Sequence, residues 1–386
     1  MTRRISRCII TLCIVMVYPA VMAQTGSVNV VTTAVPFLRI SPDARAGGMG
    51  DVGIATSPDV NSSFWNLAKV SFAPTKNAIG ATYTPWLQDL GVGDVYLASL
   101  SGYHQLGGGR ALTASLRYFS LGNIQFTDFA GNQLNTFNPK EFSFDLGYTL
   151  TLTPSLSLGV ALRYINSNLA NGSINGVSYK AGNAVAGDIS IFHNGTLNDT
   201  RSGFNWGLTL SNLGSKIGYT NDAQNKDYIP ANMGLGVAYV DLIDESNKFT
   251  FGLDVNKLLV PAPPVFTGNA SQDSVHLADY RNSSVISSYF KSFSGSTDLL
   301  KTLQVSFGVE YSYTNLFALR AGYFYEDKTQ GDRQYFSAGV GFKYNNIGMN
   351  FSYLIPSGNG VTRNPLSNTI RFGIIFDFGE PSDNGR

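Results

Sequence analysis

The chain has 386 residues, of which 14% are charged, with 27 basic and 26 acidic side chains. A balance this even argues against a surface built for nucleic acid or for another strongly charged partner. Glycine (41 residues), phenylalanine (25) and tyrosine (20) are abundant, which is typical of a transmembrane barrel whose apolar outer band is diluted by a polar interior.

Residues 1–23 have the features of a secretory signal peptide. Three arginines precede an apolar run over residues 8–17, and small residues before Gln24 form a cleavage site. Both cysteines lie in this segment, so the mature protein is expected to lack disulfides and thiol chemistry. Because no later stretch is long and apolar enough for a transmembrane helix, an exported chain of this kind is expected to enter a membrane as a closed barrel.

Stretches of period-two alternation follow one another to the end of the chain. In the last, Ile370, Phe372 and Phe376 point one way while Arg371 and Asp377 point the other, which suits a wall between lipid and a polar interior. The sequence predicts an all-β, 14-stranded antiparallel transmembrane barrel over residues 76–378. Its strands are expected near 77–85, 93–103, 109–119, 141–151, 155–166, 180–192, 203–213, 228–240, 247–257, 302–313, 316–326, 333–344, 347–355 and 368–378.

The connections between these strands alternate in length. Those expected on the periplasmic side are mostly short turns, as in outer-membrane barrels. A soluble β-sandwich would not present apolar faces outward on nearly every strand. The longer connections, expected outside the cell, are 120–140, 167–179, 214–227, 258–301, 327–332 and 356–367.

Residues 24–75 precede the first strand and are predicted to form a plug inside the barrel, packed through Phe37, Phe64 and Trp65. Residues 379–386 are expected to be a C-terminal tail. Glycines on inward strand faces agree with a plug because they allow close backbone approach, although barrel curvature explains them equally well. They are Gly147, Gly159, Gly308, Gly322, Gly339, Gly341 and Gly373.

Charged side chains also fall on the inward faces. Unpaired buried charge is costly, so we expect these residues to pair with one another and with the plug. The alternative is a polar conduit, and the mixture of signs argues against an ion-selective pore. The predicted lumen charge network is Arg117, Asp145, Arg163, Asp188, Asp254, Glu310, Arg320, Lys343 and Arg371, and Asp377 falls on the same inward faces.

No catalytic, metal or cofactor site is predicted. The glycine run 46–50 lacks the strand, helix and Lys-Ser/Thr ending of a phosphate cradle, so a tight turn is expected. His104, His193 and His276 fall at two different periplasmic ends and in an external loop, where they cannot share a metal ion. A Ser–His hydrolase would need a histidine near the membrane boundary; only His193 qualifies, and a solvated turn residue is the simpler interpretation.

The connection 258–301 is the most distinctive loop, because loops this long are usually functional or disordered. Exposed aromatic residues on a stiff, proline-bearing segment suit docking to another protein. A lid folded over the mouth of its own barrel is an equal alternative. The candidate partner-contact residues are Pro263, Pro264, Phe266, Tyr289, Phe290 and Phe293.

Several segments resemble the PorV (LptO) family of type IX secretion outer-membrane proteins, which have FadL-like barrels. They are 35–38 (Val-Pro-Phe-Leu), 41–53, 55–59, 64–66, 83–87 (Tyr-Thr-Pro-Trp-Leu), 116–122 (Leu-Arg-Tyr-Phe-Ser-Leu-Gly) and 126–128. The chain departs from FadL-like relatives at Leu67, where proline is common after the asparagine; this changes a turn in the plug.

The resemblance implies a protein of the Bacteroidetes outer membrane, in contact with lipid and lipopolysaccharide, that is not an enzyme. It also implies partners: the SprA/Sov translocon, cargo with a type IX C-terminal domain, and the attachment complex containing the sortase-like PorU. The expected role is a shuttle that carries cargo from translocon to attachment complex. A FadL-type transporter of hydrophobic small molecules is the alternative, and an enzyme acting on lipid A lacks a catalytic constellation.

Overall fold

The computed structural model describes residues 31–87, 92–127, 131–174, 177–196, 201–222, 226–294, 298–357 and 369–381. The expected signal peptide, the first residues of the expected plug and the end of the expected tail lie outside these ranges.

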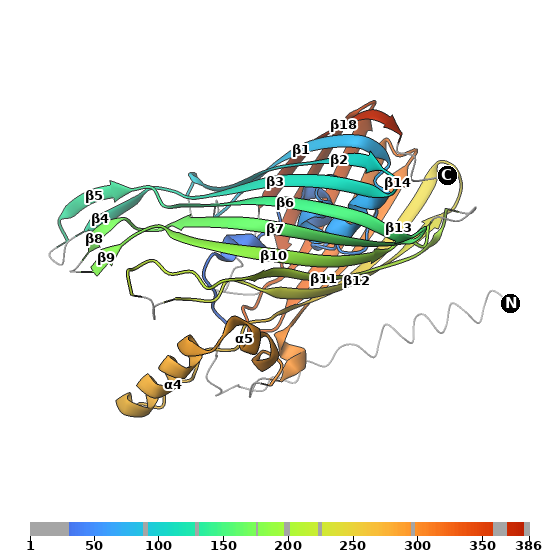
Figure 1. Ribbon diagram of the computed structural model, residues 1–386. Helices are drawn as coiled ribbons and strands as arrows, with labels where there is room; N and C mark the ends of the chain where they lie inside the picture. The colour runs from blue at the N-terminus through green and yellow to red at the C-terminus, as the bar shows by residue number, and fades with distance from the viewer. Residues whose placement is uncertain are drawn as a thin grey trace.

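Fourteen antiparallel strands close into a barrel, as the alternation predicts (Figure 1). Strands next to one another in the barrel are consecutive in the chain, apart from two small hairpins that lie outside the wall, and β1 pairs with β18 to close the ring. The barrel strands are β1 (Thr75–Pro85), β2 (Val95–Gly107), β3 (Arg110–Leu121), β6 (Lys140–Thr153), β7 (Leu156–Asn168), β10 (Gly182–His193), β11 (Gly203–Gly214), β12 (Asn232–Leu242), β13 (Asn247–Leu258), β14 (Leu303–Tyr313), β15 (Phe317–Glu326), β16 (Gln334–Tyr344), β17 (Ile347–Pro356) and β18 (Ile370–Pro381).

The wall is apolar outside and polar inside. In β7, Leu162 is 76% exposed on the outer face, whereas its neighbour Arg163 is 5% exposed on the inner face. This is the reverse of a water-soluble protein, in which leucine would be buried and arginine exposed. The same inversion recurs around the barrel, for example at Phe336 and Phe307, so the outer surface is suited to lipid.

Mostly short turns join the strands at the end of the barrel where β1 begins and β18 ends, the longer link between β10 and β11 being an exception. Thr314 and Asn315, between β14 and β15, and Asn345, between β16 and β17, have positive φ angles of 50°, 55° and 51°, as tight hairpin turns require. The longer connections gather at the other end. By the rule for outer-membrane barrels, the short-turn end is periplasmic and the long-loop end is external.

Several boundaries and loops differ from the sequence prediction. β12 begins at Asn232 rather than 228, because Pro230 has no N–H to donate and the Tyr228 carbonyl accepts from Ala34 of the plug instead. β18 continues past residue 378 to Pro381. Two external connections predicted as plain loops contain hairpins, β4 (Ile124–Thr127) with β5 (Gln133–Phe137) and β8 (Gly172–Ile174) with β9 (Val177–Tyr179).

A plug formed by the described part of the N-terminal segment lies inside the barrel (Figure 1). It consists of short helical pieces: η1 (Pro36–Arg39), α2 (Ala44–Gly47), α3 (Ser62–Trp65) and η2 (Leu67–Phe72). Its apolar side chains are buried, among them Phe37, Met49, Ile54 and Val70. Since lumen and plug are both buried, the polar groups of each must find partners in the other.

Candidate functional site

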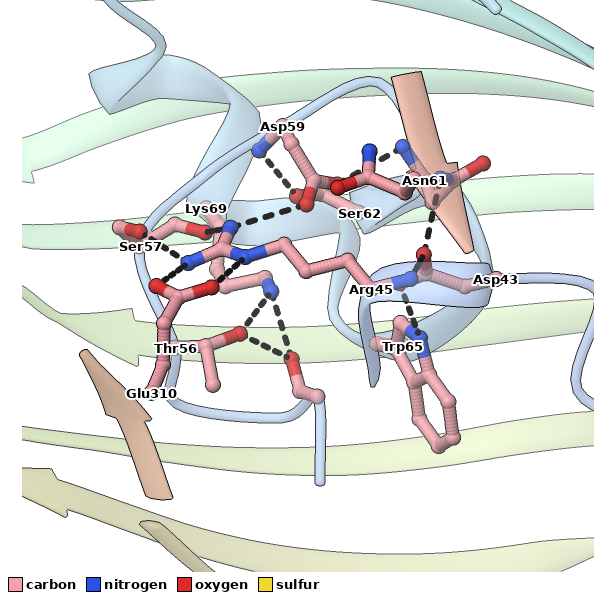
Figure 2. Close-up of polar contacts among 12 residues, drawn as sticks. Asp43, Arg45, Thr56, Ser57, Asp59, Asn61, Ser62, Trp65, Lys69 and Glu310 are labelled. Carbon is pink, nitrogen blue, oxygen red and sulfur yellow. Dashed lines mark hydrogen bonds and ion pairs between the residues drawn. The ribbon is translucent and has the colours of Figure 1, made fainter. Parts of the chain in front are cut away.

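Arg45 of α2 joins the plug to the barrel wall (Figure 2). Its Nε and Nη2 donate to the two carboxylate oxygens of Glu310 in β14, both at 2.9 Å. Its Nη1 donates to Asp59 at 3.0 Å, which also fixes the following plug loop. Burial lowers the pKa of Arg45, but the two carboxylates outweigh burial and raise it above its usual value. Arg45 therefore remains a cation that fastens α2 to the wall.

Asp43 positions this arginine and stabilises the start of α2. It is the N-cap residue, and its Oδ1 accepts from the backbone N–H of Arg45 at 2.8 Å. Its two oxygens also accept from Asn61 and from the indole N–H of Trp65, both at 3.1 Å. One carboxylate thus connects three parts of the plug that are apart in the sequence.

Glu310 and Asp254 are the predicted inward carboxylates that bind the plug. Glu310 is shared by two guanidiniums, because Nε of Arg320 in β15 donates at 2.6 Å to the same oxygen, Oε2, that accepts from Nε of Arg45. Asp254 of β13 accepts from the backbone N–H groups of Gly53 and Ile54 at 2.7 and 2.9 Å. A carboxylate that accepts two backbone N–H groups satisfies donors that would otherwise be buried without partners.

Arg371 and Asp51 form a second link between wall and plug. Arg371 of β18 is fully buried and donates to both oxygens of Asp51, with the longer contact at 3.3 Å. Tyr335 of β16 donates its hydroxyl to the same aspartate at 2.5 Å. This cluster holds the turn after α2 against β16 and β18.

The remaining predicted charges pair with one another in the wall. Asp145 of β6 lies between Arg117 of β3, at 3.2 Å, and Arg163 of β7. Arg163 also pairs with Asp188 of β10 at 2.8 Å. Lys343 pairs with Asp377 at 2.6 Å near the periplasmic end, where the Lys343 side chain is 41% exposed.

In the structure, the predicted inward charges therefore form ion pairs or, for Asp254, accept hydrogen bonds from backbone N–H groups of the plug. The sequence predicts partners in the plug, but its pattern does not single out Arg45, Asp51 or Asp59. Their signal was present: each is a charged residue in a segment otherwise rich in small and apolar side chains, and such charges need partners once buried.

Glycine lets the plug backbone approach the wall. A Cβ atom added at Gly322 of β15 would collide with backbone atoms of Met49 and Gly50, and one at Gly308 of β14 would collide with the Met49 carbonyl. Gly50 has φ of +69°, which other residues rarely adopt. The glycine run 46–50 thus forms the end of α2 and a tight turn seated on the inner wall.

Cavities lie on both sides of the plug. The periplasmic vestibule, of about 550 Å³, is lined by Arg45, Asp59 and Lys343. The outer cup, also about 550 Å³, lies on the external side, where Trp86, Leu87, Phe119 and Leu121 form its apolar wall and η1 lies beneath it. The plug separates the two cavities.

The loop 258–301 contains helices that the sequence pattern does not predict: α4 (Ala270–Asn282), α5 (Val285–Lys291) and η4 (Leu299–Thr302). Lys216 donates to the carbonyls of Arg281 and Ser283 at 2.6 and 2.7 Å, which fixes the link between α4 and α5. α4 extends away from the strands (Figure 1). The loop is thus attached at its centre, while part of it projects outward.

The candidate partner-contact residues differ in exposure. Phe290 of α5 is 75% exposed and Phe266, before α4, is 70% exposed. Phe293 is exposed but lies over the Lys257 ammonium, 5.0 Å from the ring centroid. Tyr289, Pro263 and Pro264 are partly buried. Ile286, one turn before Phe290 on α5, is also 70% exposed, although it is not among the residues predicted from the sequence.

The three histidines lie apart in β2, β10 and α4. Within the described ranges, no group of three or more His, Cys, Asp or Glu side chains is arranged to hold a metal ion. The helices of the described residues are all too short or too polar to cross a membrane.

Comparison with known families decides the identity of the barrel. A model of the family described as "Type IX secretion system protein PorV" matches residues 23–265. The chain belongs to the PorV family. Family and fold are those of a secretion or transport barrel, and together with the apolar outer wall they place the protein in the outer membrane.

Several solved structures are similar to this PorV-family barrel at low sequence identity. The CymD monoaromatic hydrocarbon channel is 11% identical with a TM-score of 0.50, over 87% of this chain and 97% of CymD. The toluene transporter TodX of P. putida is 12% identical with a TM-score of 0.49, over 87% and 98%. A Pseudomonas aeruginosa FadL homologue is 10% identical with a TM-score of 0.46, over 92% and 100%. No curated protein matches the chain.

Proposed function

We propose that this protein is the cargo-binding shuttle of type IX secretion. It receives cargo through the C-terminal signal domain at the SprA/Sov translocon and carries it to the attachment complex that contains the sortase-like PorU. Membership of the PorV family supports a role in this system. The site of these contacts is the external end of the barrel, with the loop 258–301 as the partner surface.

Two features of the structure together carry the proposal: the plug is fastened to the wall, and α5 exposes large apolar side chains. A conducting barrel needs a movable plug, whereas this plug is fixed by Arg45, Asp51 and the Asp254 contacts. Exposed aromatic residues such as Phe290 have no function in conduction, but they are the residues that form the centres of protein interfaces.

The proposal is tested by the secretome and the surface proteome of a strain that lacks the gene. We expect proteins bearing type IX C-terminal signals to disappear from surface and medium and to accumulate with the signal uncleaved. Normal secretion and processing in that strain would refute the shuttle role.

A point variant tests the partner surface. Phe290→Ser, in the same strain complemented with the variant gene, should lower secretion of these cargo proteins several-fold, because truncating an interface anchor commonly costs about 2 kcal/mol or more of binding. Leu152→Ser is the matched control: Leu152 is 53% exposed, but it lies at the periplasmic end of β6. Equal secretion by both variants would exclude Phe290 from the interface.

The alternative is a FadL-type transporter of hydrophobic small molecules. The apolar wall of the outer cup favours it, since small-molecule sites are concave and mostly apolar. This alternative predicts that the gene-deletion strain loses uptake of a hydrophobic compound while cargo secretion continues.

A further inference from the structure

The outer cup has one apolar and one polar side, and contacts among the protein's own side chains preform both. On the apolar side, Trp86 and Phe119 pack edge to face with ring centroids 6.0 Å apart, and Phe37 of the plug supports Phe119 from behind at 6.4 Å. On the polar side lie Arg39 of η1 and Arg333. A volume of about 550 Å³ is within the range of sites that hold a ligand.

The charges of the polar side do not balance. Glu326 accepts from Arg333 through both carboxylate oxygens, at 2.6 and 2.8 Å, and from Gln304 at 2.7 Å. Its negative charge is therefore matched by that of Arg333. Among the residues that the structure describes, Arg39 has no carboxylate within 4.0 Å. Two guanidiniums and one carboxylate leave one net positive charge at the cup.

The contacts of Arg39 are with neutral amides. It donates to the side-chain oxygen of Gln304 at 3.3 Å, and to that of Asn232 at 3.1 Å in the amide orientation that satisfies both groups. Burial and the neighbouring Arg333 lower the pKa of Arg39 to about 10. Arg39 is only partly buried, so its guanidinium can meet an anion that enters the cup, and such an anion would supply the counter-charge that the two amides do not.

The form of the site favours a carboxylate on a polypeptide. A guanidinium presents parallel N–H donors that match the two oxygens of a carboxylate. Beside the arginine, Thr32, Thr33 and Gln330 line the cup with polar groups. A peptide backbone needs such donors and acceptors when it leaves water, whereas an acyl chain would leave them without partners. The apolar wall suits the side chains next to the carboxyl end.

We infer that the outer cup binds the C-terminal end of a polypeptide, with the terminal carboxylate on Arg39 and the last apolar side chains against Trp86 and Phe119. This inference rests on the proposed shuttle role and deepens it: the polypeptide is the secreted cargo, and its carboxyl end is the part that the barrel itself holds. The loop 258–301 then contacts other partners while cargo occupies the cup.

The test uses the purified full-length protein in detergent and two fluorescent decapeptides, which carry the last ten residues of a type IX cargo protein of the same organism. One has a free carboxyl end and the other a carboxamide. We expect the acid to bind and the amide to bind roughly 30-fold more weakly or worse, because the neutral amide cannot form an ion pair with the Arg39 guanidinium. Quenching of Trp86 fluorescence, read in a variant with Trp65 and Trp206 replaced by phenylalanine, reports occupancy of the cup.

Two substitutions assign the effect. Arg39→Gln should weaken the acid by a similar factor and leave the amide unchanged, and Arg39→Lys should recover part of the binding because the charge is restored. Arg281→Gln, on α4 outside the cup, is the control for net charge and should bind like the parent protein.

Three outcomes would overturn the inference. The first is equal binding of acid and amide. The second is binding of hexadecanoate that depends on Arg39 while neither peptide binds, which would make the cup an acyl-chain site. The third is no binding of either peptide while the gene-deletion strain shows the expected loss of cargo secretion; the shuttle role would then stand without this site. Failure of the shuttle role itself appears in the secretion assay, whatever the peptides do.

Discussion

At the scale of single residues, the interior is organised by charges that are buried together. Arg371 is fully buried, and its guanidinium has its carboxylate partner in the plug rather than in a neighbouring strand. Buried pairs of this kind add little net stability when complete, but removing one partner leaves the other buried without compensation. Such residues therefore determine where the plug sits.

Arg371→Met should destabilise the protein by about 3–5 kcal/mol, because Asp51 would remain buried and charged. The measurement is guanidinium-induced unfolding in detergent micelles. Lys343→Met is the control, since its pair with Asp377 is partly exposed and should be worth only about 0–1 kcal/mol. If the two variants lose the same stability, the Arg371 link does not hold the plug.

At the scale of elements, the plug packs closely against three strands because these strands have glycine at the contact positions. The turn after α2 approaches β14, β15 and β16 so closely that Gly308, Gly322 and Gly339 face its backbone. Interior packing is as dense as an organic crystal and tolerates little added volume. The inward glycines of these strands thus leave space for the backbone of the turn after α2.

Gly322→Val should displace the turn after α2 and cost about 1–3 kcal/mol or more, because side chains forced into a packed site strain their surroundings. Limited proteolysis of the plug and thermal unfolding in detergent measure the two effects. Gly93→Ala is the matched control, since a Cβ atom there meets nothing within 4 Å and the glycine does not have a positive φ. An unchanged proteolysis pattern in Gly322→Val would show that the plug does not need this contact.

At the scale of the whole molecule, the plug divides the lumen into an external cup and a periplasmic vestibule. Each cavity opens to one side of the membrane, and the plug lies between them; the ion pairs of Arg45 line the vestibule, and the pair of Arg371 with Asp51 fastens the plug to the wall. This arrangement suits a protein that handles partners at its surface and keeps its barrel closed.

The protein should therefore produce no steady conductance steps in a planar lipid bilayer. A variant lacking residues 31–74 should conduct, because its barrel would keep a lumen with polar walls and no plug. Single-channel recording distinguishes the two, and circular dichroism of the deletion variant checks that the strands remain. Steady steps from the full-length protein would contradict a closed barrel.

The sequence by itself determined the wall. Because side chains alternate across a strand, period-two patterns such as Ile370–Phe378 disclosed both the strands and the faces that meet lipid, and the lengths of the connections gave the orientation. The inward charges could be identified in the same way. The partner-contact candidates of loop 258–301 rest on composition, and they stay predictions.

Only the tertiary structure decided how the parts meet. Arg45 and Glu310 are 265 residues apart, and no local pattern indicates that they pair. Residues 228–231 have the pattern of a strand but pack against the plug. The backbone N–H of Ala34 donates to the Tyr228 carbonyl, which would otherwise accept from a neighbouring strand. The ion-pair partners, the position of the plug and the cavities all depend on contacts between segments that are distant in the sequence. These contacts form only when the barrel closes around its own N-terminal chain.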